Sequence, residues 1–92
     1  MVAKISYRVL ERLVRGFANH RRIQILDLLQ HKPELSIFDI AEELSINFKT
    51  VSEHVRRLAL AGLVLKRNEG AAVRHKLTNR AHNVLKFLRT LE

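Results

Sequence analysis

The sequence predicts a mainly helical α+β domain with one small β-hairpin. Two observations predict it: apolar residues recur at helical spacing in five stretches, and one short stretch alternates around turn residues. All 92 residues, 1–92, are expected to form a single domain with a modest core. The expected helices span residues 4–17, 20–30, 36–43, 48–61 and 79–91, and the expected hairpin spans residues 63–77.

The charge of the chain is unevenly distributed. The net charge is +8, and residues 44–80 alone carry eight basic and two acidic side chains. Such an excess suits a polyanionic partner, and nucleic acid before a membrane. The absence of cysteine excludes disulfides and thiolate metal sites, and charged residues such as Lys4 and Arg8 interrupt any signal-peptide core. We therefore expect a cytoplasmic protein with no membrane partner.

The first two helices differ in how widely apolar residues surround them. In residues 4–17 apolar side chains recur every three to five positions, with Arg and Lys on the other side. Residues 20–30, with Asn19 as the expected N-cap, are apolar nearly all round, which favours a central, buried helix. Pro33 prevents this helix from continuing.

Two closely spaced helix starts predict a helix-turn-helix over residues 35–64. Ser36 is an N-cap, with Asp39 three residues later as a short relative of the capping-box Glu. The turn is Leu44-Ser45-Ile46, and Asn47 caps the next helix. The two caps leave room for about two helical turns in the first helix, the size of a scaffold helix.

The second helix of this pair carries the predicted function. Val51, Val55 and Leu58 form a narrow apolar stripe, and polar side chains, including Lys49 and Arg56, lie opposite or beside it. Long polar side chains near the start of such a helix can reach base edges in a major groove. A solvated helix face is the alternative. The residues expected to bind DNA here are Phe48, Lys49, Thr50, Ser52, Glu53, Arg56 and Arg57.

The hairpin follows Gly62, a helix stop, and turns at residues 68–71. In residues 72–77, Val73, His75 and Leu77 alternate with Arg74 and Lys76. Beside a basic helix we expect the hairpin to touch DNA, and a charged edge that resists aggregation is the alternative. The hairpin residues expected to bind DNA are Lys66, Arg67, Arg74 and Lys76.

The two terminal helices carry more apolar surface than one small core needs. Thr78 caps the last helix, and its exposed stripe would cost about 25 cal/mol per Å². We therefore expect a homodimer joined by helices 4–17 and 79–91, with a compact monomer as the alternative. The expected interface residues are Ile5, Val9, Leu13, Val84, Phe87, Leu88 and Leu91.

Three segments resemble the ArsR-type family of winged helix-turn-helix repressors. They are residues 19–26 (NHRRIQIL), residues 50–58 (TVSEHVRRL) and residues 61–64 (AGLV). The resemblance implies a homodimeric, sequence-specific regulator of transcription, expected to be a repressor. It places helix 48–61 in the major groove and the hairpin 63–77, as a wing, on the backbone or minor groove. His54 matches a family histidine, and a structural role and a DNA contact remain open for it.

The sequence departs from the metal-sensing members of that family. Ser36, Ile37 and Phe38 stand where some members carry a Cys-x-Cys pair, and His82 lacks the companions of a zinc site. The five histidines fall on different elements, so we expect no metal, no cofactor and no enzymatic activity. The alternative to a DNA-binding regulator is a winged-helix module that binds protein partners.

Overall fold

The computed structural model describes residues 4–92, in which five α-helices and one antiparallel hairpin follow in the predicted order. This confirms the predicted fold class; residues 1–3 of the expected domain lie outside the described residues. The elements are α1 (Tyr7–Phe17), α2 (His20–His31), α3 (Ile37–Leu44), α4 (Phe48–Leu60), β1 (Val64–Glu69), β2 (Ala72–Leu77) and α5 (Asn79–Arg89).

Side-chain caps begin every helix. The four predicted caps are confirmed: Asn19, Ser36, Asn47 and Thr78 each accept a hydrogen bond from a backbone N–H of the first helical turn. The prediction that the first helix begins at residue 4 is wrong. Ser6 is its N-cap and accepts from the backbone N–H of Val9 at 3.2 Å, so α1 begins three residues later.

The last helix is also shorter than predicted. Its capping residue at the C-terminal end is Thr90, so α5 ends at Arg89 and not at residue 91. Helix α3 is displaced by one residue from the predicted range because Ser36, as the cap, lies outside the helix. The predicted and observed helix ends thus differ by one to three residues, and helix ends are the least regular part of a helix.

Helix α2 lies at the centre of the fold. Ile25, Leu26 and Leu29 are buried, and α2 contacts α4, α5 and β2. The predicted stripe of α4, made of Val51, Val55 and Leu58, is fully buried in the same core. Burying this stripe fixes the rotation of α4 about its own axis and therefore decides which side chains face solvent.

A tight turn joins α3 to α4. Ser45 has φ 53°, in the left-handed region, and its backbone N–H donates to the carbonyl of Glu42. The next backbone N–H, of Ile46, donates to the carbonyl of Ala41 at 3.0 Å. These bonds satisfy the last carbonyls of α3 and let the chain reverse within three residues, as predicted.

The hairpin is paired in register from Val64–Leu77 to Glu69–Ala72, which leaves Gly70 and the residue after it as the loop. This loop is narrower than the predicted turn, and Gly70 adopts φ +60°. His75 also bridges to Leu35, so the segment before α3 adds a third short strand contact to β2.

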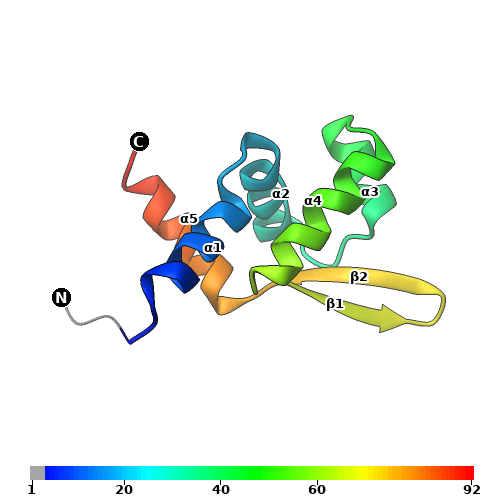
Figure 1. The fold of residues 1–92 in the computed structure, drawn as a ribbon. Helices are drawn as coiled ribbons and strands as arrows, with labels where there is room; N and C mark the ends of the chain where they lie inside the picture. The colour runs from blue at the N-terminus through cyan, green and yellow to red at the C-terminus, as the bar shows by residue number, and fades with distance from the viewer. Residues whose placement is uncertain (1–3) are drawn as a thin grey trace.

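The molecule is elongated, with extents of 45 × 29 × 21 Å. The hairpin projects from one end, and α1, α5 and the C-terminus lie toward the other (Figure 1). Helices α3 and α4 lie above the hairpin in this view. None of the described helices is long and apolar enough to cross a membrane.

Candidate nucleic-acid interface

Helix α4 presents a polar side to solvent. Because Val51, Val55 and Leu58 face the core, Lys49 and Arg56 lie on the opposite, exposed side. The start of the helix is held by Asn47, whose Oδ1 accepts from the backbone N–H of Lys49 at 2.8 Å. The other predicted residues of α4, Phe48, Thr50, Ser52, Glu53 and Arg57, are also exposed. The structure therefore gathers all seven on the uncovered surface of one helix.

Glu53 holds two arginines on this surface. Arg56 donates from Nε and Nη2 to the two carboxylate oxygens of Glu53 at 2.9 and 2.7 Å, and Arg57 donates from Nε at 3.2 Å. These hydrogen bonds, with Arg56 first, lower the pKa of Glu53 to about 2. The carboxylate is thus ionised near neutral pH, and it orients both guanidinium groups.

An exposed aromatic pair stands at the start of α4. The rings of Phe38 and Phe48 have centroids 4.6 Å apart, and the two residues are 73% and 42% exposed. Phe48 was a predicted site residue, whereas Phe38 was not. The contact between Phe38 and Phe48 depends on how α3 packs against α4, so the sequence alone could not identify Phe38.

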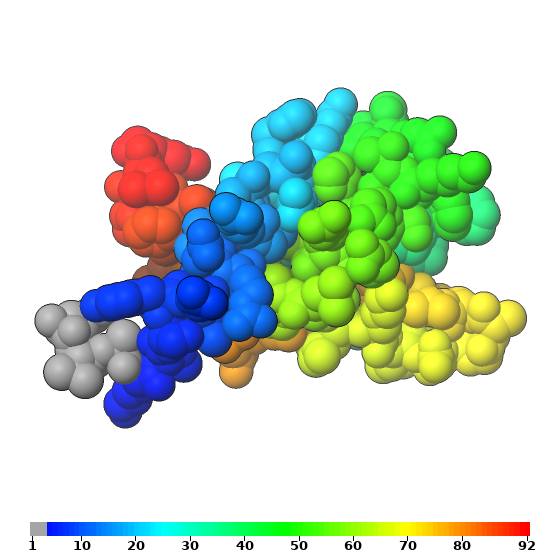
Figure 2. Space-filling model, in the orientation of Figure 1, coloured from blue at the N-terminus to red at the C-terminus, as the bar shows by residue number. Residues whose placement is uncertain are grey.

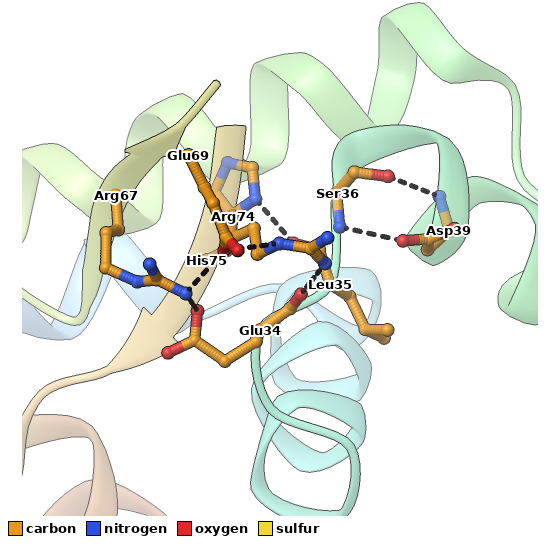
Figure 3. A network of polar contacts seen from close by, with 8 residues as sticks. All are labelled: Glu34, Leu35, Ser36, Asp39, Arg67, Glu69, Arg74 and His75. Carbon is orange, nitrogen blue, oxygen red and sulfur yellow. Dashed lines mark hydrogen bonds and ion pairs between the residues drawn. The ribbon is translucent and has the colours of Figure 1, made fainter. Parts of the chain in front are cut away.

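The wing carries four basic residues, but two of them are already paired. Arg67 donates from Nη2 to Glu34 at 2.9 Å and to Glu69 at 3.0 Å. Arg74 donates from Nε to Glu69 at 3.0 Å and from Nη1 to the carbonyl of Glu34 at 3.1 Å. Figure 3 shows both arginines converging on these two acidic residues. Within residues 4–92, Lys66 and Lys76 form no ion pair, so they are the freer cations of the wing.

A buried histidine attaches the wing to the helix-turn-helix. His75 is 1% exposed, and its Nδ1 donates to the carbonyl of Leu35 at 2.8 Å (Figure 3). Its backbone N–H donates to the same carbonyl at 3.0 Å. Burial lowers the pKa of His75, against the opposing effect of its bond to Leu35. The sequence predicted that His75 shares a face with Val73 and Leu77, opposite Arg74 and Lys76, but not this attachment, which spans forty residues of chain.

His54 lies on the flank of α4 and is partly buried. Burial, followed by the charge of Arg22, lowers its pKa. Both causes favour the neutral imidazole over a cation that would attract phosphate. This environment favours the structural role over the DNA contact.

Figure 2 shows α4 and the wing on the same face of the molecule, with α1 beside α4. Within residues 4–92, no group of three or more His, Asp or Glu side chains is placed to hold a metal ion. The predicted site residues of α4 and of the wing therefore lie at the surface of neighbouring elements, and Glu34, Glu53 and Glu69 pair with some of their arginines.

The residues predicted to join two chains divide into exposed and buried sets. Phe87 and Leu91 are 55% and 66% exposed, and Ile5 and Val9 are also exposed. Leu13 and Leu88 are partly buried against the core. Val84 was predicted at the interface, but it is buried in the core of the chain itself, because it lies on the inner side of α5. Two residues absent from the predicted interface set, Tyr7 and Val14, are exposed on α1.

The comparisons with known proteins agree with this geometry. The family described as winged helix-turn-helix DNA-binding matches residues 19–64, which is half of the chain. The crystal structure of the transcriptional regulator HlyU from Vibrio vulnificus is 31% identical, covers 89% of this chain and 85% of its own, and has a TM-score of 0.74. No curated protein matches the sequence.

Two further structures match nearly the whole chain. HlyU from Vibrio cholerae is 28% identical, covers 97% of each chain and has a TM-score of 0.81. A homodimeric winged helix-turn-helix DNA-binding domain from Mycobacterium bovis, described as a possible ArsR-family transcriptional regulator, is 26% identical, covers 99% of this chain and 89% of its own, and has a TM-score of 0.83. The chain therefore belongs to the winged helix-turn-helix DNA-binding family of transcriptional regulators, and its similarity to ArsR-type regulators confirms the resemblance drawn from its sequence.

Proposed function

We propose that the protein is a sequence-specific repressor that inserts α4 into the major groove of duplex DNA. The observation that carries this proposal is the exposed stripe of α4, turned outward by the burial of Val51, Val55 and Leu58. On that stripe, Lys49 and Arg56 suit the O6 and N7 acceptors of guanine. Phe48, at the first position of the helix, suits the methyl group of thymine.

The wing supplies contacts to the sugar–phosphate backbone or the minor groove. Lys66 and Lys76 are free to meet phosphate oxygens when α4 is in the groove. Arg67 and Arg74 can also contact phosphates only if they give up their hydrogen bonds to Glu34 and Glu69. Such contacts position the protein along the duplex and carry no sequence information.

Two chains bind together, through α1 and α5. The support is the apolar surface left open by Phe87, Leu91 and Tyr7 in one chain. Exposed apolar side chains on these two helices are typical of a surface that another protein covers. The similar domain from Mycobacterium bovis is homodimeric. A two-fold dimer presents two α4 helices, so the two half-sites of the operator would lie about one helical turn apart, or a multiple of it.

We assign the repressing direction on the proposal that α4 reads DNA and that α1 and α5 join two chains. Occupying an operator with these two surfaces is sufficient to block access to a promoter. As a DNA-binding regulator the protein would act in the cytoplasm, where operator DNA lies in bacteria such as those that carry the similar proteins.

The second candidate function is a winged-helix module that binds another protein. The exposed pair of Phe38 and Phe48 favours it, since aromatic side chains are enriched at protein interfaces. Selection of bound duplexes from a random DNA pool separates the two functions. The repressor is expected to enrich a two-fold symmetric site and to bind it more tightly than a scrambled duplex in fluorescence anisotropy. Failure to enrich any sequence would favour the protein-binding module.

A further inference from the structure

Five arginines line a groove between α1 and the C-terminal half of α4. The groove has a volume of about 430 Å³, and no acidic residue lines it. Of the residues predicted to bind DNA, only Arg57 lines it, and Val9 and Leu13, predicted at the dimer interface, line its α1 side. The arginines are Arg12, Arg15, Arg22, Arg57 and Arg80.

The floor of the groove is formed by a close approach of two helices. A Cβ atom added at Gly16 would lie 2.4 Å from the Cβ atom of Ala61, so only glycine fits at this crossing. Arg22 closes one side, because its Nη1 donates to the carbonyls of Arg15 and Gly16 at 3.1 and 3.0 Å. The Nε atom of Arg22 is buried and makes no hydrogen bond within the described residues. Arg22 is thus a fixed wall of the groove.

The positive charge of the groove is only partly balanced. Arg15 pairs with Glu11 at 3.5 Å, and Arg57 pairs with Glu53 at 3.2 Å. Within residues 4–92, Arg12 and Arg80 form no ion pair; the one hydrogen bond of Arg80 goes to the carbonyl of Ala61 at 3.4 Å. Like charges gathered in this way repel one another unless an anion lies between them.

The groove opens on the side of α4 that faces DNA in the proposed function. Leu60 is 74% exposed and lines the groove. It follows Lys49, Glu53 and Arg56 at intervals of four, three and four residues along the same stripe of the helix. The groove therefore continues the proposed reading surface past the end of α4 and toward α1 (Figure 2).

We propose that this arginine groove binds the phosphate backbone of the operator between the two half-sites. A DNA strand fits its chemistry, because anionic phosphates alternate with deoxyribose rings whose C–H faces can lie on Leu60. In a dimer joined through α1 and α5, the groove lies between α4 and the two-fold axis. The inference rests on the proposed function and adds a third contact region to α4 and the wing.

Alanine substitution of the two unpaired arginines tests the proposal. Arg12→Ala, Arg80→Ala and the double variant are compared with the wild type on the selected operator and on a scrambled duplex, at several salt concentrations. Each lost phosphate contact is expected to flatten the plot of log affinity against log salt by about 0.9. The affinity should fall alike for both duplexes, because phosphate contacts carry no sequence information.

Lys86→Ala is the matched control for each single variant, because Lys86 is exposed on α5, does not line the groove, and its loss makes the same change of net charge. The charge-preserving double variant Arg12→Lys with Arg80→Lys should restore the wild-type salt dependence. Ethylation interference should map phosphates near the operator centre that matter for the wild type and not for the alanine double variant.

Three outcomes would overturn the proposal in distinguishable ways. If Arg12→Ala and Arg80→Ala each had the same salt dependence as Lys86→Ala, the groove would be removed from the DNA interface while the proposed function stands. Octanoate serves as a probe for a small organic anion. If octanoate raised the melting temperature of the wild type in a saturable way, and the alanine double variant lost this effect, the groove would be a site for such an anion. A wild type that binds no duplex would overturn the proposed function and the groove together.

Discussion

Replacing Glu53 with glutamine tests whether this carboxylate restrains the arginines on the exposed side of α4. In the free protein this one carboxylate accepts from Arg56 at 2.7 and 2.9 Å and from Arg57 at 3.2 Å. Glu53→Gln removes the charge that holds both guanidinium groups and keeps the size of the side chain. We expect tighter binding to random DNA and a smaller gap between operator and random DNA.

The size of the effect follows from the number of arginines released. Each arginine that gains a phosphate steepens the plot of log affinity against log salt by about 0.9, so two give about 1.8. Over a fourfold change in salt, a difference of 1.8 corresponds to about a twelvefold additional change in affinity. Since the pKa of Glu53 is about 2, the wild-type carboxylate remains charged at pH 5. Lowering the pH from 8 to 5 should therefore not give the wild type the salt dependence of Glu53→Gln.

Fluorescence anisotropy on the operator and a scrambled duplex, over a range of salt concentrations, measures these quantities. Glu43→Gln is the matched control, because it makes the same change of net charge on α3, where Glu43 pairs with Lys32 at 2.6 Å. Equal salt dependence for the two variants would mean that Glu53 acts only through net charge. Weaker binding of Glu53→Gln to random DNA would refute the idea that Glu53 restrains the two arginines.

Three further predictions concern assembly, pH and packing. Phe87→Glu should convert a dimer into a monomer of 10.7 kDa in light scattering, and a wild type that is already monomeric at micromolar concentration would contradict the dimer. Because burial lowers the pKa of His75 in the folded chain below its ordinary value of 6.5, the unfolded chain takes up the proton first as the pH falls. The free energy of unfolding should therefore decrease below pH 6.5, by at most about 1.4 kcal/mol per pH unit from this residue. His54, whose pKa is also lowered, should decrease the free energy of unfolding in the same pH range. In urea unfolding, His75→Gln should weaken this pH dependence, and an unchanged dependence would exclude His75 as a cause. Gly16→Ala should destabilise the fold by about 1–3 kcal/mol from the contact with Ala61, less about 1 kcal/mol gained in helix propensity. Adding Ala61→Gly should remove the contact, and equal destabilisation with and without it would contradict this reason.

The parts of the fold that depend on local sequence could be predicted closely. Ser36 and Asp39 form the predicted capping box, since both partners lie within one helical turn. The outward side of α4 was also predictable, because the spacing of its apolar residues alone sets which side is buried. Ser6 was not predicted as a cap, because Ile5 just before it fits the apolar spacing of the helix.

The parts that depend on distant contacts could not be predicted. The pairing of Arg67 with Glu34 joins positions 33 residues apart, and the bond from Arg74 to the Glu34 carbonyl spans 40. Both depend on how the segment before α3 lies against the wing, which no local pattern encodes. The arginine groove has the same origin, because it exists only where α1 crosses α4 at Gly16.

The most direct test of the central claim is the effect of Arg56→Ala on sequence preference. Binding of this variant and of the wild type is measured on the selected operator and on every single-base change in it. If α4 reads the major groove, the variant should bind the operator roughly five- to a hundredfold more weakly and lose preference at one base position in each half-site. An equal loss of affinity for all sequences would show that Arg56 contacts phosphate, and it would contradict the reading role assigned to this side of α4.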